Sequence, residues 1–301
     1  MKRFVSKYKY KIISICSVVT FFLLWGLGSA LEWFNPVFIP PLSDVWAAFI
    51  DVLENGYKGY SLLYHIASSM KRLFSAIALG FVLAVPCGLL AGISKSFLAV
   101  IDLFVEFFRA LPPLAYYTLL VLWFGIGDSS KISLLFLGAF FPLFIATVFA
   151  VRKVPKERIN GVKSLGGGGW QIFYRVLFPS CLPDILTGLR QSVAVAYATL
   201  VAAEMVAAVS GLGWMVLDAS KYIRFDIVYF GIIIMGAIAI VIDSVIRLLI
   251  RKSIPWIGKE SKGRGDYEKT TNFGKSSSGS GIDRCTWSDG RMRTKCRQYT
   301  E

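Results

Sequence analysis

The segment Ile159–Arg190, INGVKSLGGGGWQIFYRVLFPSCLPDILTGLR, is basic and rich in glycine, yet it lies between two strongly apolar stretches. Cytoplasmic loops of membrane proteins carry an excess of Lys and Arg. From residue 152 to residue 184 the only acidic residues are Glu157 and Asp184. We therefore predict a structured cytoplasmic loop over 152–184. Its basic residues are Arg152, Lys153, Lys156, Arg158, Lys163 and Arg175.

The composition is that of a membrane protein rather than of a soluble domain. The 301 residues are 55% hydrophobic, and the mean hydropathy is positive. Crossing roughly 30 Å of hydrocarbon takes about 20 apolar residues, and several stretches of that length almost lack charge. We predict an all-α membrane protein with both termini in the cytoplasm. Its six spans are 12–31, 73–93, 98–124, 132–151, 185–209 and 227–246.

The third span is interrupted by ionisable residues and by Pro112. Ionisable groups at membrane depth normally face a bundle interior or a water-filled cavity, which is one reading of Asp102, Glu106 and Arg109. In the alternative reading these residues lie in the interface, and the true span begins near Leu111. Both readings stay open at the level of sequence.

The sequence between the first and second predicted spans contains an amphipathic segment, the single histidine and a basic pair. Residues 43–56 have apolar residues at helical spacing, and Ser43 is the predicted N-cap. This amphipathic helix either lies along the outer membrane surface or packs against the bundle. His65, the single histidine, is predicted to be an interfacial helix residue. The basic pair Lys71-Arg72 departs from the charge rule, because the topology places it on the outer side.

Charge and cysteine content exclude several functions. The net charge of +14 is high enough for a nucleic-acid-binding protein, but the basic residues flank apolar spans or lie near the C-terminus, as in membrane proteins. The five cysteines are too scattered for a zinc or disulfide framework. We therefore expect no nucleic-acid partner and no metal site.

Residues 262–301 differ from the rest of the chain. They are polar, rich in Gly, Ser and basic residues, and lack apolar periodicity, which predicts disorder. The sequence Gly274-Lys275-Ser276 suggests a nucleotide-binding loop, but such a loop requires a glycine at the position of Lys269. This tail is either a lineage-specific extension or a frameshifted end.

The motif S-L-G, followed after about a dozen residues by P-x-x-x-P-x-I-L-x-G-L-R, resembles the signature loop of ABC-importer permease subunits. In that family a short coupling helix docks into a cytoplasmic ATPase. The family pattern usually places Glu-Ala-Ala where this chain has Asn160-Gly161-Val162, and a glycine in a helix costs about 1 kcal/mol relative to alanine. The resemblance implies these ATPase-coupling residues: Asn160, Gly161, Lys163, Ser164, Leu165, Gly166, Trp170, Pro179 and Pro183.

Further motifs resemble one branch of these permeases, which serves taurine, aliphatic sulfonates and nitrate. They include FIPPLSDVW (38–46), LVAAEM (200–205) and SGLGWMV (210–216). The ending RLLIRKSIPWIGKE (247–260) is most similar to taurine permeases. The resemblance covers residues 1–261, the predicted permease domain, and implies the type I importer fold with six transmembrane helices and a cytoplasmic coupling helix.

The resemblance also implies a mechanism in the bacterial cytoplasmic membrane. Two permease copies form the pathway, a dimeric ATPase uses ATP and Mg, and an extracytoplasmic binding protein delivers the solute. No cofactor is bound by the permease itself. For an anionic solute, Arg109 and Arg190 are the expected pathway partners, and Glu204 is a buried acid that would disfavour an anion unless it is paired or protonated.

Other readings remain. Within transport, the cargo is alternatively an aliphatic sulfonate, nitrate or a thiamine-precursor pyrimidine. A membrane-embedded enzyme would need a converged set of nucleophile, base or metal ligands, which one histidine does not provide. A stand-alone secondary transporter leaves the basic glycine- and proline-containing loop unexplained.

Overall fold

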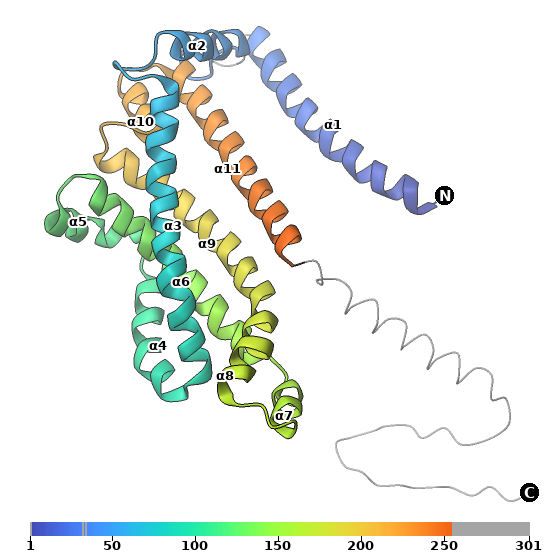
Figure 1. The fold of residues 1–301 in the computed structure, drawn as a ribbon. Coiled ribbons are helices and arrows are strands. Elements are labelled where there is room, and N and C mark those ends of the chain that lie inside the picture. Colours follow the sequence, from blue (N-terminus) through green and yellow to red (C-terminus); the bar gives the residue numbers. More distant parts are fainter. Residues whose placement is uncertain (1, 32, 34, 255–301) are drawn as a thin grey trace, which may run out of the picture. The chain divides into compact units, whose positions relative to one another are not determined.

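The computed structural model describes residues 2–31, 33 and 35–254, so the predicted tail 262–301 and the end of the predicted permease domain lie outside the described residues. The described chain is helical, with one isolated bridge between Tyr57 and Tyr60 (Figure 1). The helices are α1 (Lys2–Ala30), α2 (Leu42–Glu54), α3 (Leu62–Ile93), α4 (Lys95–Ala110), α5 (Pro113–Phe124), α6 (Asp128–Lys153), α7 (Lys156–Ser164), α8 (Gly169–Ile172), the π-helix η1 (Phe173–Leu177), α9 (Phe178–Ala207), α10 (Leu212–Lys221) and α11 (Phe225–Ser253).

Four of the described helical stretches are long and apolar enough to cross a membrane. They are α3, α6, the stretch from α8 to the end of α9, and α11. Two shorter apolar helices, Ile15–Ala30 and Pro113–Phe124, fall within the first and third predicted spans. The all-α membrane fold expected from the sequence is therefore confirmed.

The third predicted span, 98–124, is two helices rather than one. Helix α4 ends at Ala110 and α5 begins at Pro113, with Leu111 in an extended conformation. A residue before proline is disfavoured in the α region, and proline is well tolerated at the first helical position. The two prolines therefore end one helix and begin the next.

The centre of the bundle is formed by α3, α6 and α9, whose side chains contribute most of the largest buried cluster. Glycines let these helices approach closely. A Cβ on Gly88 of α3 would lie 2.7 Å from Cβ of Thr147 on α6, and a Cβ on Gly188 of α9 would collide with Ala146. Small residues at such crossings are typical of membrane helices. Gly88 is thus part of a helix–helix contact.

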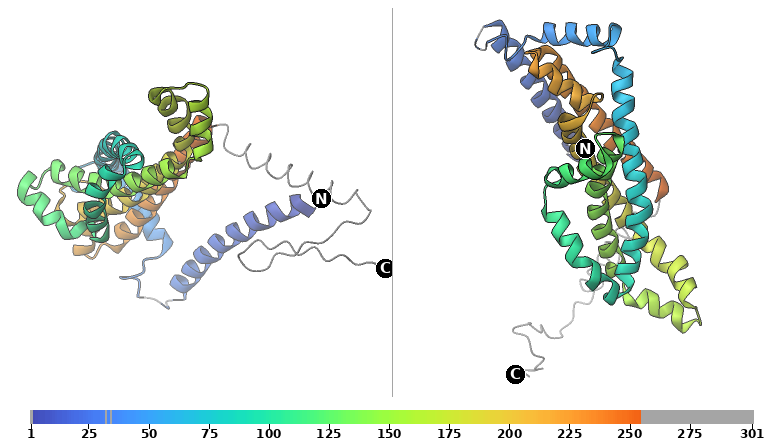
Figure 2. Two further views of the ribbon diagram at one scale, coloured as in Figure 1. Left: turned by 90° about the horizontal axis from the view of Figure 1, so that it is seen from below. Right: turned by 90° about the vertical axis from the view of Figure 1, so that its left-hand side faces the viewer.

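Helix α2 lies across one end of the long helices, and α7 and α8 lie at the opposite end (Figures 1 and 2). Val45, Ala48 and Val52 of α2 are buried in a cluster with residues of α10 and α11, so this amphipathic helix packs against the bundle. Its N-cap is Pro41. The predicted N-cap, Ser43, is wrong: it lies inside the first turn, where its hydroxyl donates to Asp44.

Candidate functional site

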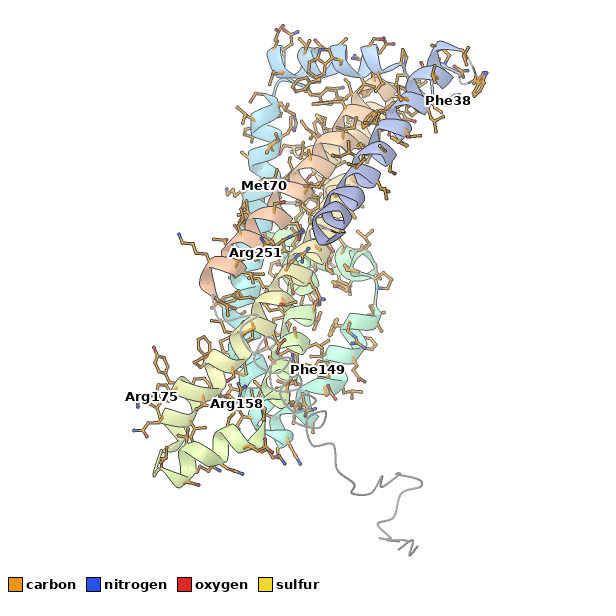
Figure 3. All side chains as sticks on the ribbon, turned by 90° about the vertical axis from the view of Figure 1, so that its right-hand side faces the viewer. Phe38, Met70, Phe149, Arg158, Arg175 and Arg251 are labelled. Carbon is orange, nitrogen blue, oxygen red and sulfur yellow. The ribbon has the colours of Figure 1, made fainter. Side chains whose placement is uncertain are left out.

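The basic loop folds as a projecting segment at one end of the structure. Figure 3 labels Arg158 and Arg175 near that end and Phe38 near the other. None of the nine residues of α7 is buried. The segment from α7 to η1, residues 156–177, is hereafter called the coupling segment.

Helix α7 is continuous across Asn160-Gly161-Val162, the three residues that stand where the family pattern has Glu-Ala-Ala. Asn160 and Gly161 both lie inside the helix, and an added Cβ on Gly161 would meet nothing within 4 Å. The hydroxyl of Ser164 donates to the Asn160 carbonyl at 3.1 Å. Glycine at position 161 is therefore not required by crowding.

The turn that ends α7 does require glycine. Gly166 has a φ of +79°, in the left-handed region that residues other than glycine rarely adopt. Its N–H donates to the Lys163 carbonyl, and the Gly167 N–H donates to the Val162 carbonyl, both at 2.9 Å. This left-handed C-terminal cap satisfies helix-end carbonyls. The start of the glycine run thus sets the direction in which the chain leaves α7.

Large apolar side chains are exposed on the coupling segment. Leu165 is 89% exposed and Trp170 is 77% exposed. The Trp170 ring stacks on Phe173 with 5.8 Å between the centroids. Exposed apolar groups rimmed by charged residues commonly mark a protein-interaction surface. The coupling segment therefore has the character of a docking surface.

Both ends of the coupling segment are fixed to the bundle at neighbouring points. Lys153, at the end of α6, pairs with Asp184 near the start of α9 at 3.0 Å. An exposed pair of this kind stabilises little, but Cys181 on the same turn of α9 is fully buried. Pro179 lies at the N-terminus of α9 and Pro183 lies inside it. The two ends of the coupling segment therefore lead into α6 and α9 at neighbouring points.

A buried ion pair joins α3 to α9 near the other end. Arg72 donates through Nη1 to Oε1 of Glu204 at 2.8 Å. The Arg72 side chain is 5% exposed and that of Glu204 is 1% exposed. Arg72 also donates through Nε to Asp128, at the start of α6, at 2.7 Å. One guanidinium thus joins α3, α6 and α9.

The turn after α9 wraps around the Glu204 carboxylate. Gly213 N–H donates to Oε2 of Glu204 at 3.0 Å, and Arg72 Nη1 donates to the Ser210 carbonyl at 2.9 Å. Ser69 Oγ donates to the same carboxylate and accepts the Leu212 N–H at 3.0 Å. Because every buried charge here has partners, the desolvation penalty of burying it is offset.

His65 is buried rather than interfacial. Its side chain has no exposed surface, since it lies against Trp214 with 5.7 Å between the ring centroids. Its Nδ1 accepts the Gly211 N–H at 3.1 Å, and Nε2 lies 3.3 Å from the Tyr57 carbonyl. In the loop before α3, burial raises the pKa of Tyr57, and so does the hydrogen bond that its hydroxyl donates to Asp218.

A second charged cluster joins α9 to α11. Arg190 donates through Nε and Nη2 to the two carboxylate oxygens of Asp243, and Arg247 donates through Nη2 to the same carboxylate. These residues border a groove of about 420 Å³ between the two helices, which Tyr197 and Ser244 also line. Two guanidinium groups and one carboxylate give the groove a formal charge of +1. Residues 190, 197, 243, 244 and 247 are hereafter called the α9–α11 groove.

The three residues predicted to line the pathway do not come together within one subunit. Arg190 and Glu204 both lie on α9, and their fourteen-residue separation corresponds to about 21 Å at 1.5 Å per residue. Arg109 is exposed in the last turn of α4. Glu204 faces the subunit interior, where Arg72 balances its charge. Their place in the pathway stays a prediction.

Sequence reasoning missed Arg72 and Ser69 as partners of Glu204. Two features of the sequence pointed to this pairing. The basic pair Lys71-Arg72 lies on the predicted outer side, against the charge rule, and Glu204 is an acid inside the predicted span 185–209. A buried carboxylate requires a partner, so the two anomalies explain each other.

An all-α membrane bundle with an exposed coupling segment at one end is the architecture of a transport permease. The chain belongs to the family described as binding-protein-dependent transport system inner membrane component, whose model matches residues 84–254. It is therefore a multi-pass membrane subunit of a transporter rather than an enzyme, and the family binds no cofactor of its own. Among the described residues, no group of three or more His, Cys, Asp or Glu is placed to hold a metal ion.

The relatives belong to the branch expected from the sequence motifs. The taurine transport system permease protein of Escherichia coli is 35% identical over 82% of this chain and 90% of its own length. The putative aliphatic sulfonates transport permease protein of Bacillus subtilis is 33% identical over 77% of this chain and 83% of its own. The nitrate import permease protein of Leptolyngbya laminosa is 24% identical over 80% and 88%.

Solved structures support the fold. An inward-facing MetNI methionine ABC transporter aligns with a TM-score of 0.57 at 19% identity, covering 64% of this chain and 95% of the solved chain. Identity this low speaks only for the fold. The predicted type I importer fold is confirmed.

Proposed function

We propose that this chain is the permease subunit of an ATP-driven importer for a small sulfonate, taurine in particular. The observation that carries the proposal is the coupling segment, an exposed basic surface with protruding Leu165 and Trp170, in a chain of this family. The choice of taurine is supported by the 35% identity to a taurine permease over most of both chains.

The proposed assembly has two permease copies, a cytoplasmic ATPase dimer and an extracytoplasmic binding protein. ATP and Mg are used by the ATPase, and both permease termini lie in the cytoplasm. The coupling residues are those of the sequence motif: Asn160, Gly161, Lys163, Ser164, Leu165, Gly166, Trp170, Pro179 and Pro183.

Coupling follows from differential binding. A ligand shifts a conformational equilibrium only when it binds the two states with different affinity. The ATPase dimer is that ligand, since ATP binding and hydrolysis change its shape while it holds the coupling segment. The segment is continuous with α6 and α9, which form the bundle core. Movement of the ATPase therefore moves these two helices.

The test is uptake of labelled taurine in a host that lacks its own taurine uptake. The chain is co-expressed with the ATPase and binding protein encoded beside it, and unlabelled taurine, ethanesulfonate and nitrate are added in turn as competitors. Taurine uptake that unlabelled taurine suppresses most strongly is the expected result. Stronger suppression by ethanesulfonate would identify an aliphatic sulfonate permease, which the second relative favours. Failure of any ATPase to co-purify with the chain would overturn the proposal.

A further inference from the structure

The charged residues of the α9–α11 groove lie on two helical stretches that are long and apolar enough to cross a membrane. Arg190 is the thirteenth residue of α9, and Asp243 is the nineteenth of the 29 residues of α11. Their side chains are 43% and 35% exposed within the subunit, and that of Arg247 is 52% exposed. Ionisable groups inside membrane spans face water-filled cavities or other protein rather than lipid. This side of the subunit therefore faces the pathway or the second permease copy.

The ion pairs leave donors free in the groove. A guanidinium carries five N–H donors. Arg190 uses Nε and Nη2 on Asp243, and Arg247 uses Nη2, so within the described contacts Nη1 of both residues is available to an anion. Guanidinium groups in a fixed fork are well suited to oxyanions. Asp243 supplies the opposite charge within the same 420 Å³ groove.

We propose that the α9–α11 groove is a transit site for a short zwitterionic aminosulfonate, an inference that rests on the proposed function. Arg190 and Arg247 bind the sulfonate oxygens, and Asp243 binds the ammonium group at the other end of the solute. A simple anion such as nitrate or an alkanesulfonate meets the same guanidiniums but is repelled by Asp243. The groove thus discriminates by the presence of an amino group.

The ion pairs that Asp243 forms with Arg190 and Arg247 keep the affinity of this site for the solute low. A solute that binds the guanidiniums competes with Asp243 for the same donors, so part of its interaction energy is offset by the contacts it displaces. Sites along a conduction path must bind well enough to admit a solute and weakly enough to release it. The bidentate contact between Arg190 and Asp243 therefore suits transit rather than storage.

The test is protection of an introduced cysteine in the full permease–ATPase complex. Ser244→Cys places a thiol in the groove, and Val241→Cys places one on α11 outside the groove, where Val241 is 60% exposed. The native cysteines are replaced in both variants. The rate of labelling by a negatively charged methanethiosulfonate reagent is measured with taurine and with ethanesulfonate.

At ten times its half-protecting concentration, taurine is expected to slow labelling of Ser244→Cys about tenfold by mass action, and to leave Val241→Cys unchanged. When Asp243→Asn is added to Ser244→Cys, the protection from labelling by taurine should fall to about the level given by ethanesulfonate. When Asp243→Glu is added instead, taurine should still protect better than ethanesulfonate. Equal protection by both solutes before and after Asp243→Asn overturns the proposal, and so does the absence of protection. Retention of the bound ATPase on gel filtration shows that each variant is folded.

The outcomes separate this inference from the proposed function. Taurine uptake by the wild type without protection at Ser244→Cys overturns the transit site alone. Absence of uptake for every sulfonate overturns the proposed function, whatever the labelling result.

Discussion

Arg72 and Glu204, 132 positions apart in the sequence, form a buried ion pair with 2.8 Å between Nη1 and Oε1. The same guanidinium reaches Asp128 and the Ser210 carbonyl. Helices α3, α6 and α9 and the turn before α10 are therefore held by one side chain. This set of contacts lies away from the coupling segment, and it ties the three helices and the turn to one another.

Breaking this pair from one side should strongly destabilise the protein. Glu204→Gln leaves the buried Arg72 guanidinium with only the half-exposed carboxylate of Asp128 as a counter-ion. Removal of one partner of a buried pair costs about 3–5 kcal/mol. We expect a lower melting temperature of the detergent-solubilised chain. The double variant Arg72→Met with Glu204→Gln should lose less stability than the two single variants summed. Additive losses would show that the two side chains are not coupled.

Gly211 should resist substitution because of both its backbone and its surroundings. Its φ of 127° belongs to a region open essentially to glycine, where strain amounts to about 1–3 kcal/mol. A Cβ there would also lie 2.5 Å from the oxygens of Glu204. Gly211→Ala should lower thermal stability. The matched control is Gly236→Ala, whose Cβ meets nothing within 4 Å and should not reduce stability. Equal effects of the two substitutions would argue against this account of the turn.

The exposed apolar residues of the coupling segment should matter for association rather than for folding. Buried interface aromatics often cost about 2 kcal/mol or more when truncated, which is more than tenfold in affinity. Trp170→Ala should therefore weaken ATPase binding at least about tenfold with an unchanged melting temperature. Phe149→Ala, at an exposed position on α6, serves as the control. The affinity for the ATPase is measured by pull-down at graded ATPase concentration. If Trp170→Ala binds the ATPase as tightly as wild type, Trp170 is not part of the docking surface.

Replacement of Gly161 by alanine should stabilise α7. The added Cβ would enter open space, and alanine favours a helix by about 1 kcal/mol over glycine. Gly161→Ala should slow amide hydrogen exchange in residues 156–164 by about fivefold, the factor that corresponds to this free energy. Gly166→Ala should have the opposite effect because of its positive φ. Faster exchange in Gly161→Ala would mean that α7 is not limited by helix propensity.

The long apolar helices and the coupling loop were predictable because their signals are local. High hydropathy predicted α3, α6, α9 and α11, and the excess of basic residues in 152–184 predicted the loop. The burial of His65 and the pairing of Arg72 with Glu204 were not predictable in this way, because each depends on residues far away in the sequence. The break at Leu111 was visible in the two prolines. The N-cap at Pro41 was missed because Ser43 carries the stronger cap propensity.

The measurement that tests the central claim most directly is ATP-dependent taurine uptake into liposomes that contain the complete complex. Wild type is compared with Gly166→Val, which disfavours the left-handed turn at the end of α7, and with Gly168→Ala, whose Cβ enters open space. Wild type and Gly168→Ala are expected to take up taurine, whereas Gly166→Val is expected to lose both uptake and ATPase association. Full taurine uptake by Gly166→Val, or ATPase association without the coupling segment, would contradict the central claim.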